Sequence, residues 1–224
     1  MDPQTLLPAL SLLLASALAA PVFAQTPSLE QASGLKGLNV EVVATTYKGR
    51  AATRLTPRLA SPTVANGEGM ALLSGPGFEN GTIELDVAGR LGSGASPTAR
   101  GFIGLAFDVS PDALRFKAFY LRPTNGRADD QLRRNHSTQY ISMPEHPWER
   151  LRSEEPGVYE SYVDLEEGAW THMRIVVEGG KARLHVNGAD QPCLIVNDLK
   201  HAARGGALAL WIGAGTEGYF ANLK

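Results

Sequence analysis

The chain has only one cysteine, Cys193, among its 224 residues, so it can form no internal disulfide. Its stability must therefore come from a packed core and not from cross-links. Cys193 begins a short apolar run, Cys193-Leu194-Ile195-Val196, and nothing nearby in the sequence would lower the pKa of its thiol. We interpret it as a small buried side chain and not as a nucleophile.

A surplus of either charge is also missing. Lys and Arg number 21 and Asp and Glu number 23, which gives a formal net charge of -2 at pH 7. Nucleic acids and anionic membranes select strongly basic surfaces, and this composition does not provide one. The sequence therefore predicts no nucleic-acid partner.

Common catalytic signatures are absent as well. The sequence contains no G-x-S-x-G, H-E-x-x-H or P-loop motif. Residues 213–218, G-A-G-T-E-G, have the glycine spacing of a dinucleotide-binding loop. Such a loop needs a helix after it, and the chain ends six residues later, so we interpret the segment as a tight turn.

Metal-ligand patterns are sparse. His172 and His185 fall on the polar face of a predicted hairpin without a nearby third ligand. We predict no cofactor and no metal. A calcium site at Asn125, Asp129 and Asp130 is the alternative, which the neighbouring arginines oppose.

The N-terminus is typical of an export signal. An apolar run from Leu6 to Ala20 precedes Val22-Phe23-Ala24, which has small side chains at the two positions that signal peptidase inspects. The run is shorter than the ~20 apolar residues that a bilayer crossing needs. We predict that residues 1–24 are removed and that the mature chain, beginning at Gln25, is secreted or periplasmic with no membrane attachment.

Strand signals dominate the remainder. Residues 25–37 are predicted to form a flexible leader, and residues 38–224 a single domain. In the segment 82–87, T-I-E-L-D-V, apolar and polar side chains alternate as on a half-buried strand. Around a dozen such strands with turn residues between them predict an all-β fold of two antiparallel sheets. The only helical candidate is Leu199–Arg204.

Several segments in this order resemble the concanavalin A-like lectin/glucanase superfamily, above all its laminin-G-like and 3-keto-disaccharide-hydrolase-like sandwiches. They are F-E-N-G-T-I-E-L-D-V (78–87), R-G-F-I-G-L-A-F-D-V (100–109), W-T-H-M-R-I-V-V-E-G-G-K-A-R-L-H-V-N-G (170–188) and the final G-Y-F-A-N-L-K. These motifs mark structure more than catalysis. The resemblance implies a jelly-roll sandwich whose concave sheet and loops bind sugars in many members.

Glucanases of this superfamily carry alternating carboxylates on one strand, and Glu84 and Asp86 match the first two of them. Ala88 stands where the third would be. Carboxylates two residues apart on a strand lie roughly 6.5 to 7 Å apart, whereas retaining hydrolysis requires about 5 to 5.5 Å. We interpret the pair as the solvated face of a strand.

The longest interruption of the strand pattern is the polar segment between Tyr120 and Tyr162. Its recurring apolar residues argue against disorder, so a functional loop is the better interpretation. Sugar recognition combines planar polar groups with an aromatic face. The hydrogen-bonding candidates are Arg122, Asn125, Arg133, Arg134, Asn135 and Gln139, and the aromatic candidates are Tyr140, Trp148 and Tyr159.

The leading hypothesis is an exported carbohydrate-recognition sandwich that binds a sugar or glycoside through residues 122–160. The alternative is a glycoside-cleaving enzyme of the 3-keto-disaccharide-hydrolase-like type, with Glu160 or Glu149 as acid or base. Two further possibilities stay open. The arginines and carboxylates of the segment could pair with one another to hold it down, or the domain could be a protein-interaction module.

Overall fold

The computed structural model describes residues 27–58 and 68–224. The predicted signal peptide, residues 1–24, and the predicted cleavage point before Gln25 lie outside the described residues. None of the helices in the described ranges is long and apolar enough to cross a bilayer.

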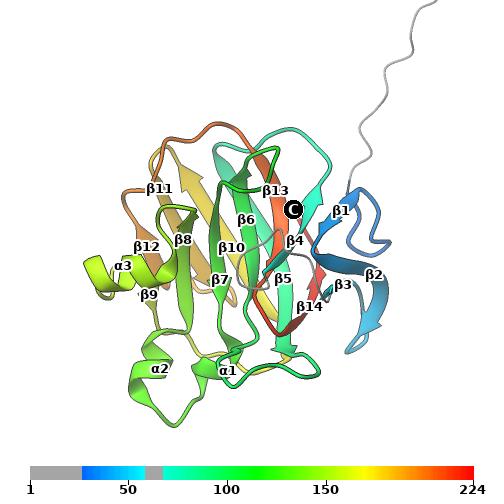
Figure 1. The fold of residues 1–224 in the computed structure, drawn as a ribbon, viewed down its shortest axis with the longest axis horizontal. Helices are drawn as coiled ribbons and strands as arrows, with labels where there is room; N and C mark the ends of the chain where they lie inside the picture. Colours follow the sequence, from blue (N-terminus) through cyan, green and yellow to red (C-terminus); the bar gives the residue numbers. More distant parts are fainter. Residues whose placement is uncertain (1–26, 59–67) are drawn as a thin grey trace, which may run out of the picture.

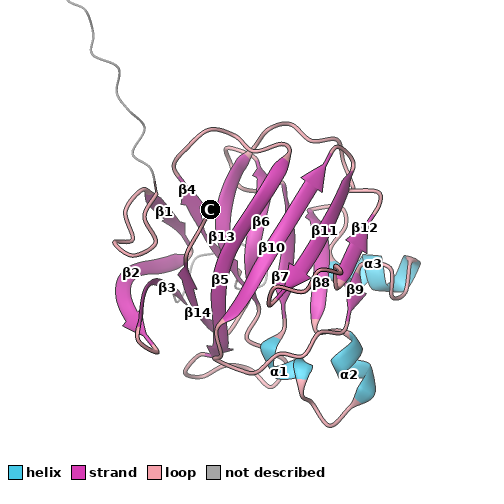
Figure 2. Ribbon diagram, turned by 180° about the vertical axis from the view of Figure 1, so that it is seen from behind, coloured by secondary structure: helices cyan, strands magenta, loops and turns pink. Residues whose placement is uncertain are grey.

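Two seven-stranded antiparallel sheets pack face to face (Figures 1 and 2). The first sheet has the order β1 (Leu35–Leu38), β4 (Gly69–Leu73), β13 (Ala207–Ile212), β6 (Ile103–Val109), β7 (Phe116–Leu121), β8 (Thr138–Met143) and β9 (Glu160–Ser161). The second has the order β12 (Leu194–Val196), β11 (Lys181–Val186), β10 (Thr171–Glu178), β5 (Gly81–Leu91), β14 (Thr216–Ala221), β3 (Arg50–Pro57) and β2 (Val40–Tyr47). The predicted two-sheet antiparallel sandwich is confirmed.

Alternation along the strands builds the core between the sheets. On β5 the residues Ile83, Leu85 and Val87 are buried, and Ile83 and Leu85 lie across from Ile175 and Met173 on β10. The hairpin of β10 and β11 turns at Gly179-Gly180, where Gly179 has φ +58°, a conformation that glycine adopts without strain. Each large apolar side chain buried in this way contributes about 1.5 to 3 kcal/mol relative to an exposed one.

The first sheet is apolar on both faces. Its inward face contributes Leu105, Phe119 and Leu210 to the core between the sheets. Its outward face carries a second buried cluster, which includes Tyr120 on β7 and Trp211 on β13. An outward face rich in aromatic and small side chains can receive a ligand, and it positions the site described below.

The N-terminal segment differs from its prediction. Residues 27–37 were predicted to be flexible, but Leu29 is 4 % exposed within the core and its carbonyl accepts a hydrogen bond of 2.6 Å from Thr53 Oγ1. Leu35 begins β1, which pairs with β4. Two apolar residues in a Ser- and Gly-rich stretch are enough to anchor this segment.

The helical prediction is also wrong. Leu199–Arg204 contains no helix, whereas three short helices lie in the polar segment that was interpreted as a loop: α1 (Pro123–Gly126), α2 (Gln131–Asn135) and α3 (Trp148–Glu154). The same segment contains β8, a six-residue strand between β7 and β9. The polar residues of this region therefore lie on ordered elements.

Candidate functional site

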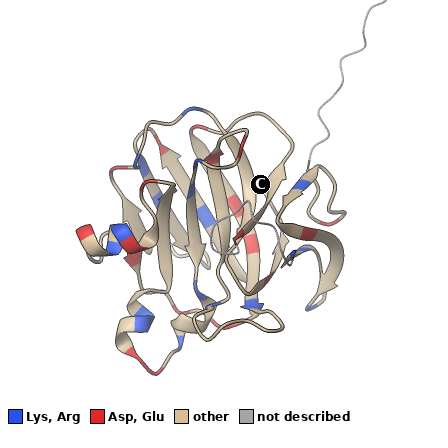
Figure 3. Ribbon diagram, viewed as in Figure 1, with Lys and Arg blue, Asp and Glu red and all other residues tan. Residues whose placement is uncertain are grey.

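The polar segment occupies one edge of the first sheet. Strands β8 and β9 extend that sheet beyond β7, while α1 and α2 lie at one end of it and α3 lies beside β8 and β9 (Figures 1 and 2). Figure 3 shows basic residues on α2 and residues of both charges on α3. Side chains from these helices and from the outward face of the sheet enclose two adjoining cavities.

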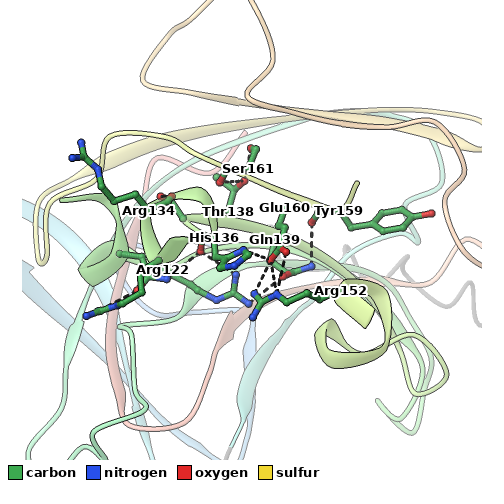
Figure 4. Close-up of polar contacts among 12 residues, drawn as sticks. Arg122, Arg134, His136, Thr138, Gln139, Arg152, Tyr159, Glu160 and Ser161 are labelled. Carbon is green, nitrogen blue, oxygen red and sulfur yellow. Dashed lines mark hydrogen bonds and ion pairs between the residues drawn. The ribbon is translucent and has the colours of Figure 1, made fainter. Parts of the chain in front are cut away.

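Arg122, directly after β7, is buried and makes three hydrogen bonds. It is 4 % exposed, and its guanidinium donates to Tyr120 Oη at 2.9 Å, Gln139 Oε1 at 3.1 Å and the His136 carbonyl at 3.0 Å (Figure 4). All three acceptors are uncharged. Burial lowers the pKa of Arg122, because no carboxylate in the described part of the chain lies within ion-pair distance to compensate its charge.

Trp148, the first residue of α3, lies against two guanidinium groups. The Cζ atom of Arg152 is 4.6 Å from the indole centroid and that of Arg122 is 5.8 Å from it. Arg122 Cζ is also 6.0 Å from the ring centroid of Phe102. These cation–π contacts fix the planes of the arginines and leave Trp148 37 % exposed.

Arg152 is anchored by Glu160. Its Nε lies 3.0 and 3.1 Å from the two carboxylate oxygens, and its Nη2 lies 2.6 Å from Oε2 (Figure 4). His136 Nδ1 is 2.8 Å from the same Oε2 but at an angle that makes no hydrogen bond. Burial, opposed in part by Glu160, lowers the pKa of His136. Glu160 therefore holds Arg152 in place, and its oxygens are already engaged.

We call the first cavity the basic compartment. It has a volume of about 330 Å³ and is lined by Thr98, Arg100, Phe102, Arg122, Asn125, Arg133, His136, Trp148 and Arg152. Arg133 donates to Asn125 Oδ1 at 3.3 Å, while its buried Nε has no partner in the described structure. Burial and the charges of Arg133 and Arg122 lower the pKa of Arg100, which shows how closely the guanidiniums crowd.

We call the adjoining cavity the acidic compartment. It has a volume of about 250 Å³ and is lined by Glu68, Ser96, Thr98, Ala99, Phe102, Tyr120, Trp148, Glu149, Trp211, Gly213 and Ala214. Thr98, Phe102 and Trp148 line both cavities, so the two compartments form one groove with these residues as a shared wall. Tyr120 and Trp211, whose ring centroids are 4.8 Å apart, form the aromatic floor.

Glu68 is the most perturbed carboxyl group of the groove. Burial raises its pKa to about 7, the charge of Glu149 adds to this shift, and the nearby Trp211 opposes it. The buried Nε1 of Trp211 makes no hydrogen bond of normal geometry within the described residues, although it lies close enough to influence Glu68. The compartment thus combines an acid that titrates near neutral pH with a free donor.

The predicted site residues divide into three groups. Arg122, Asn125, Arg133 and Trp148 line the basic compartment, and Glu149 lines the acidic one. Asn135 and Glu160 line a third cavity of about 640 Å³ together with Leu132, His136, Arg152, Pro156, Gly157, Ser161 and Tyr162. The groove therefore unites five of the residues that the sequence suggested.

Four predicted ligand contacts lie elsewhere. The rings of Tyr140 and Tyr159 are 0 % and 1 % exposed in the core between the sheets, so neither can stack on a ligand. Gln139 is buried and supports Arg122. Arg134 donates to Tyr162 Oη at 3.1 Å and lines neither compartment, and Figure 4 shows it pointing away from the Arg152–Glu160 pair.

Sequence reasoning missed Glu68, Arg100, Tyr120, Arg152 and Trp211. Tyr120 and Trp211 looked like ordinary strand residues, and Glu68 like part of a turn. Alternation offered one signal, because Tyr120 has the opposite phase to the core residues Phe119 and Leu121. No local sequence pattern predicts the strand order that brings β13 close to β7.

Glu84 and Asp86 lie on β5 in the second sheet, away from the groove. Asp86 is 9 % exposed and contacts Arg50, His172 Nδ1 at 2.8 Å and Asn222 Nδ2 at 2.6 Å. The interpretation of Asp86 as a solvated residue is therefore wrong, because a network of polar partners covers it.

Two of the residues of the calcium alternative make hydrogen bonds within the chain. Asn125 donates to the His136 carbonyl at 3.2 Å and accepts from Arg133, while Asp130 Oδ1 accepts from the Arg133 backbone as the N-cap of α2. Within the ranges described, no three His, Cys, Asp or Glu residues gather as a potential metal site. Asn125 Oδ1 and Asp130 Oδ1 thus each accept a hydrogen bond from Arg133.

The single cysteine has a raised thiol pKa. Cys193 is partly buried, and burial raises the pKa of its thiol to about 11. A thiol with such a pKa is almost wholly protonated at neutral pH, which agrees with its interpretation as a packing residue.

Comparisons with known proteins place the fold. No protein-family model matches the chain, and no curated protein matches it. Among solved structures, the carbohydrate-binding module CBM66 from Bacillus subtilis has a TM-score of 0.54 at 14% identity, covering 85% of this chain and 93% of that chain. The chain has the jelly-roll sandwich fold.

Two further structures support this assignment. A Bacillus subtilis protein of unknown function with a galectin-like fold has a TM-score of 0.51 at 10% identity, covering 89% of this chain and 93% of that chain. The exoplasmic/lumenal domain of VIP36, in a Ca²⁺/Man3GlcNAc-bound form, has a TM-score of 0.51 at 12% identity, covering 85% of this chain and 81% of that chain. The predicted resemblance to concanavalin A-like domains is thus confirmed at the level of fold.

Proposed function

We propose that this protein is a carbohydrate-recognition domain that binds a sugar or glycoside in the groove formed by the two compartments. The observation that carries the proposal is the shared wall. Trp148 and Phe102 offer ring faces, while guanidinium, amide and carboxyl groups converge from both sides. Carbohydrates need this combination, because their rings have apolar faces and their hydroxyls bond in pairs to planar polar groups.

Fold neighbours support the proposal. CBM66 is named as a carbohydrate-binding module, and the VIP36 domain is described in a form bound to Man3GlcNAc. Neither likeness transfers a specificity at these identities, so the ligand has to be argued from the groove itself.

A glycan array followed by calorimetric titration of the mature chain, residues 25–224, tests the proposal. We expect saturable binding of at least one class of glycan at a single site. The absence of binding across neutral, uronate-bearing and sulfated glycans would overturn it.

A second candidate function, glycoside cleavage, is favoured by one observation. Glu68 has a pKa of about 7 and shares its cavity with Glu149, so a protonated acid and a second carboxyl group lie beside the same aromatic wall. Glycosidases combine a carboxylic acid with a carboxylate in this manner. Glu160, the acid suggested by the sequence, is less suited because both its oxygens accept from Arg152.

Turnover assays distinguish the two functions. If the protein is an enzyme, Glu68→Gln and Glu149→Gln each abolish release of reducing ends from the bound glycan while binding persists. If the wild-type protein binds a glycan and leaves it intact, the recognition function alone stands.

Export is part of the proposal and depends on residues 1–24, whose pattern is that of a signal peptide. Expression with the native N-terminus in a bacterial host, followed by N-terminal sequencing of the exported fraction, should give Gln25 as the first residue. Retention of the uncleaved chain in the cytoplasm would contradict this part of the proposal.

A further inference from the structure

The basic compartment contains more positive charge than its own residues neutralise. Four arginines line it: Arg100, Arg122, Arg133 and Arg152. Only Arg152 has a carboxylate partner, Glu160, and no acidic side chain among the residues described lies within 4.0 Å of the other three guanidiniums. Three charges thus share a cavity of about 330 Å³ without a counterion from residues 27–58 or 68–224.

Crowding of these positive charges destabilises the folded protein unless an anionic ligand compensates them. Charged groups taken out of water lose hydration, and like charges in a partly dry cavity repel one another. Arg122 is 4 % exposed and therefore bears most of this cost. The lowered pKa values of Arg100 and Arg122 have these two causes, burial first and neighbouring arginines among the further ones.

The guanidiniums are also held in fixed orientations. Arg122 is fixed by Tyr120, Gln139 and the His136 carbonyl, and Arg100 donates at 2.7 Å to each of the carbonyls of Pro97 and Ala99. All of these acceptors are neutral, so they position the arginines and leave the charge in place. The Nε of Arg133 is buried and has no hydrogen-bond partner within the described structure.

Planar guanidinium groups that are fixed in this way match anions with two or more oxygens. Carboxylate and sulfate groups accept parallel N–H bonds from such forks, and these charge-assisted bonds are about twice as strong as neutral ones. A neutral hydroxyl would leave the three charges uncompensated. The chemistry of the compartment therefore selects an anionic substituent.

We infer that the groove binds an acidic saccharide, with its carboxylate or sulfate group in the basic compartment beside Arg100, Arg122 and Arg133. This inference rests on the proposed recognition function and names its ligand class. The sugar ring that carries the anion lies against Trp148 and Phe102, and the next ring reaches the acidic compartment. There the indole N–H of Trp211 and the carboxyl groups of Glu68 and Glu149 bond uncharged hydroxyls.

Titration with three galactose-based probes tests the inference. The mature chain, residues 25–224, is titrated with oligogalacturonate, with sulfated galactan oligosaccharides and with neutral galactan oligosaccharides, alongside an array holding other uronate, sulfated and neutral glycans. We expect at least one acidic class to bind about tenfold or more tightly than its neutral counterpart. The class that binds distinguishes carboxylate from sulfate recognition.

Variants that each remove one arginine charge test where the anionic group of the glycan binds. Arg100→Gln and Arg133→Gln should each weaken binding of the acidic glycan about tenfold. Arg127→Gln is the matched control, because Arg127 is exposed and paired with Asp164 and Glu166 outside the groove. Two independent variants keep the test available if one of them fails to fold.

The outcomes separate failure of the inference from failure of the proposed function. Binding of neutral glycans alone overturns the inference and leaves the recognition function standing. Equal loss of affinity in the Arg127→Gln control also overturns it, because the effect is then one of overall charge. No binding to any class of glycan overturns the recognition function and the inference together.

Discussion

The two halves of the groove share one wall and differ in every other respect. The basic compartment is built by the helices and loops that follow β7 together with the loop between β5 and β6, and four arginines line it. The acidic compartment is built on the outward face of the sheet, where Tyr120 and Trp211 form its floor beside Glu68. Three of the four arginines come from the polar segment, whereas the two aromatic side chains of the floor come from strands.

This difference in charge favours one orientation of a ligand in the groove. A ligand with an anion at one end and hydroxyls at the other fits in one orientation, because the reverse would bring its anion to Glu68 and Glu149. The long polar segment is thus not a complete site. It supplies most of the basic compartment, and the rest of the groove comes from the outward face of the sheet and from the loops before β6 and after β13.

The largest effect that we predict concerns Glu68 and pH. The folded-state pKa of about 7 lies above the ordinary value of 4.5, so the folded protein binds this proton more tightly than the unfolded chain does. The resulting stabilisation is present below pH 4.5 and is lost as the pH rises to 7, with a maximum of about 3 kcal/mol. Chemical denaturation of wild type and Glu68→Gln across this pH range measures it. Parallel pH profiles for the two proteins would contradict the assignment.

The basic compartment depends on the Arg152–Glu160 pair. Arg152→Gln leaves the Glu160 carboxylate, whose side chain is 3 % exposed, without its main partner, so the free energy of unfolding should fall by about 2 kcal/mol. The double variant Arg152→Gln/Glu160→Gln should recover most of this loss. Arg150→Gln on the same helix is the control, since its pair with Glu154 is exposed and contributes less than about 0.5 kcal/mol. Equal destabilisation by both single variants would show that α3 as a whole, and not the buried pair, is responsible.

The shared wall should matter to both halves of the groove. Trp148→Ala removes the ring face common to the two compartments, and we expect roughly 10- to 100-fold weaker glycan binding. Trp170→Ala is a matched control, since Arg50 Cζ lies 4.8 Å from the Trp170 ring centroid in a similar cation–π pair outside the groove. Calorimetric titration of both variants checks the comparison, and a similar loss in the control would place the site elsewhere.

The smallest effect concerns a tyrosine that the sequence placed in the site. Tyr140 lies in the core, and its hydroxyl accepts a hydrogen bond of 3.0 Å from the Lys200 backbone. Tyr140→Phe should lower the free energy of unfolding by about 1 kcal/mol and leave glycan affinity unchanged. A change in glycan affinity without a change in the free energy of unfolding would show that Tyr140 contacts the ligand.

Much of the fold could be predicted because strand alternation is a local signal. The phase of Ile83, Leu85 and Val87 alone identifies a buried face, and the hairpin around Gly179-Gly180 follows from its glycines. The N-terminal leader could not be predicted in the same way. Leu29 packs into the core through contacts with residues distant in sequence, and no periodic pattern surrounds it.

The candidate site was predictable only on its loop side. Arg122, Arg133 and Trp148 stand in a segment whose composition indicates binding, and they do line the groove. Tyr140 has the same chemistry but lies on β8 with its ring directed into the core. Trp211 joins the groove only because β13 takes its place beside β4 and β6 in the sheet. Which side of a strand a residue faces, and which strands become neighbours, are properties of the folded sheet.

Tryptophan fluorescence shows most directly whether a glycan occupies the groove. The chain has three tryptophans, and two of them, Trp148 and Trp211, line the groove. In a Trp170→Phe variant all tryptophan emission comes from these two residues. We expect a saturable change in emission with the glycan that binds in calorimetry, at the same dissociation constant. Calorimetric binding without any change in emission would show that the sugar binds outside the groove and would contradict the account.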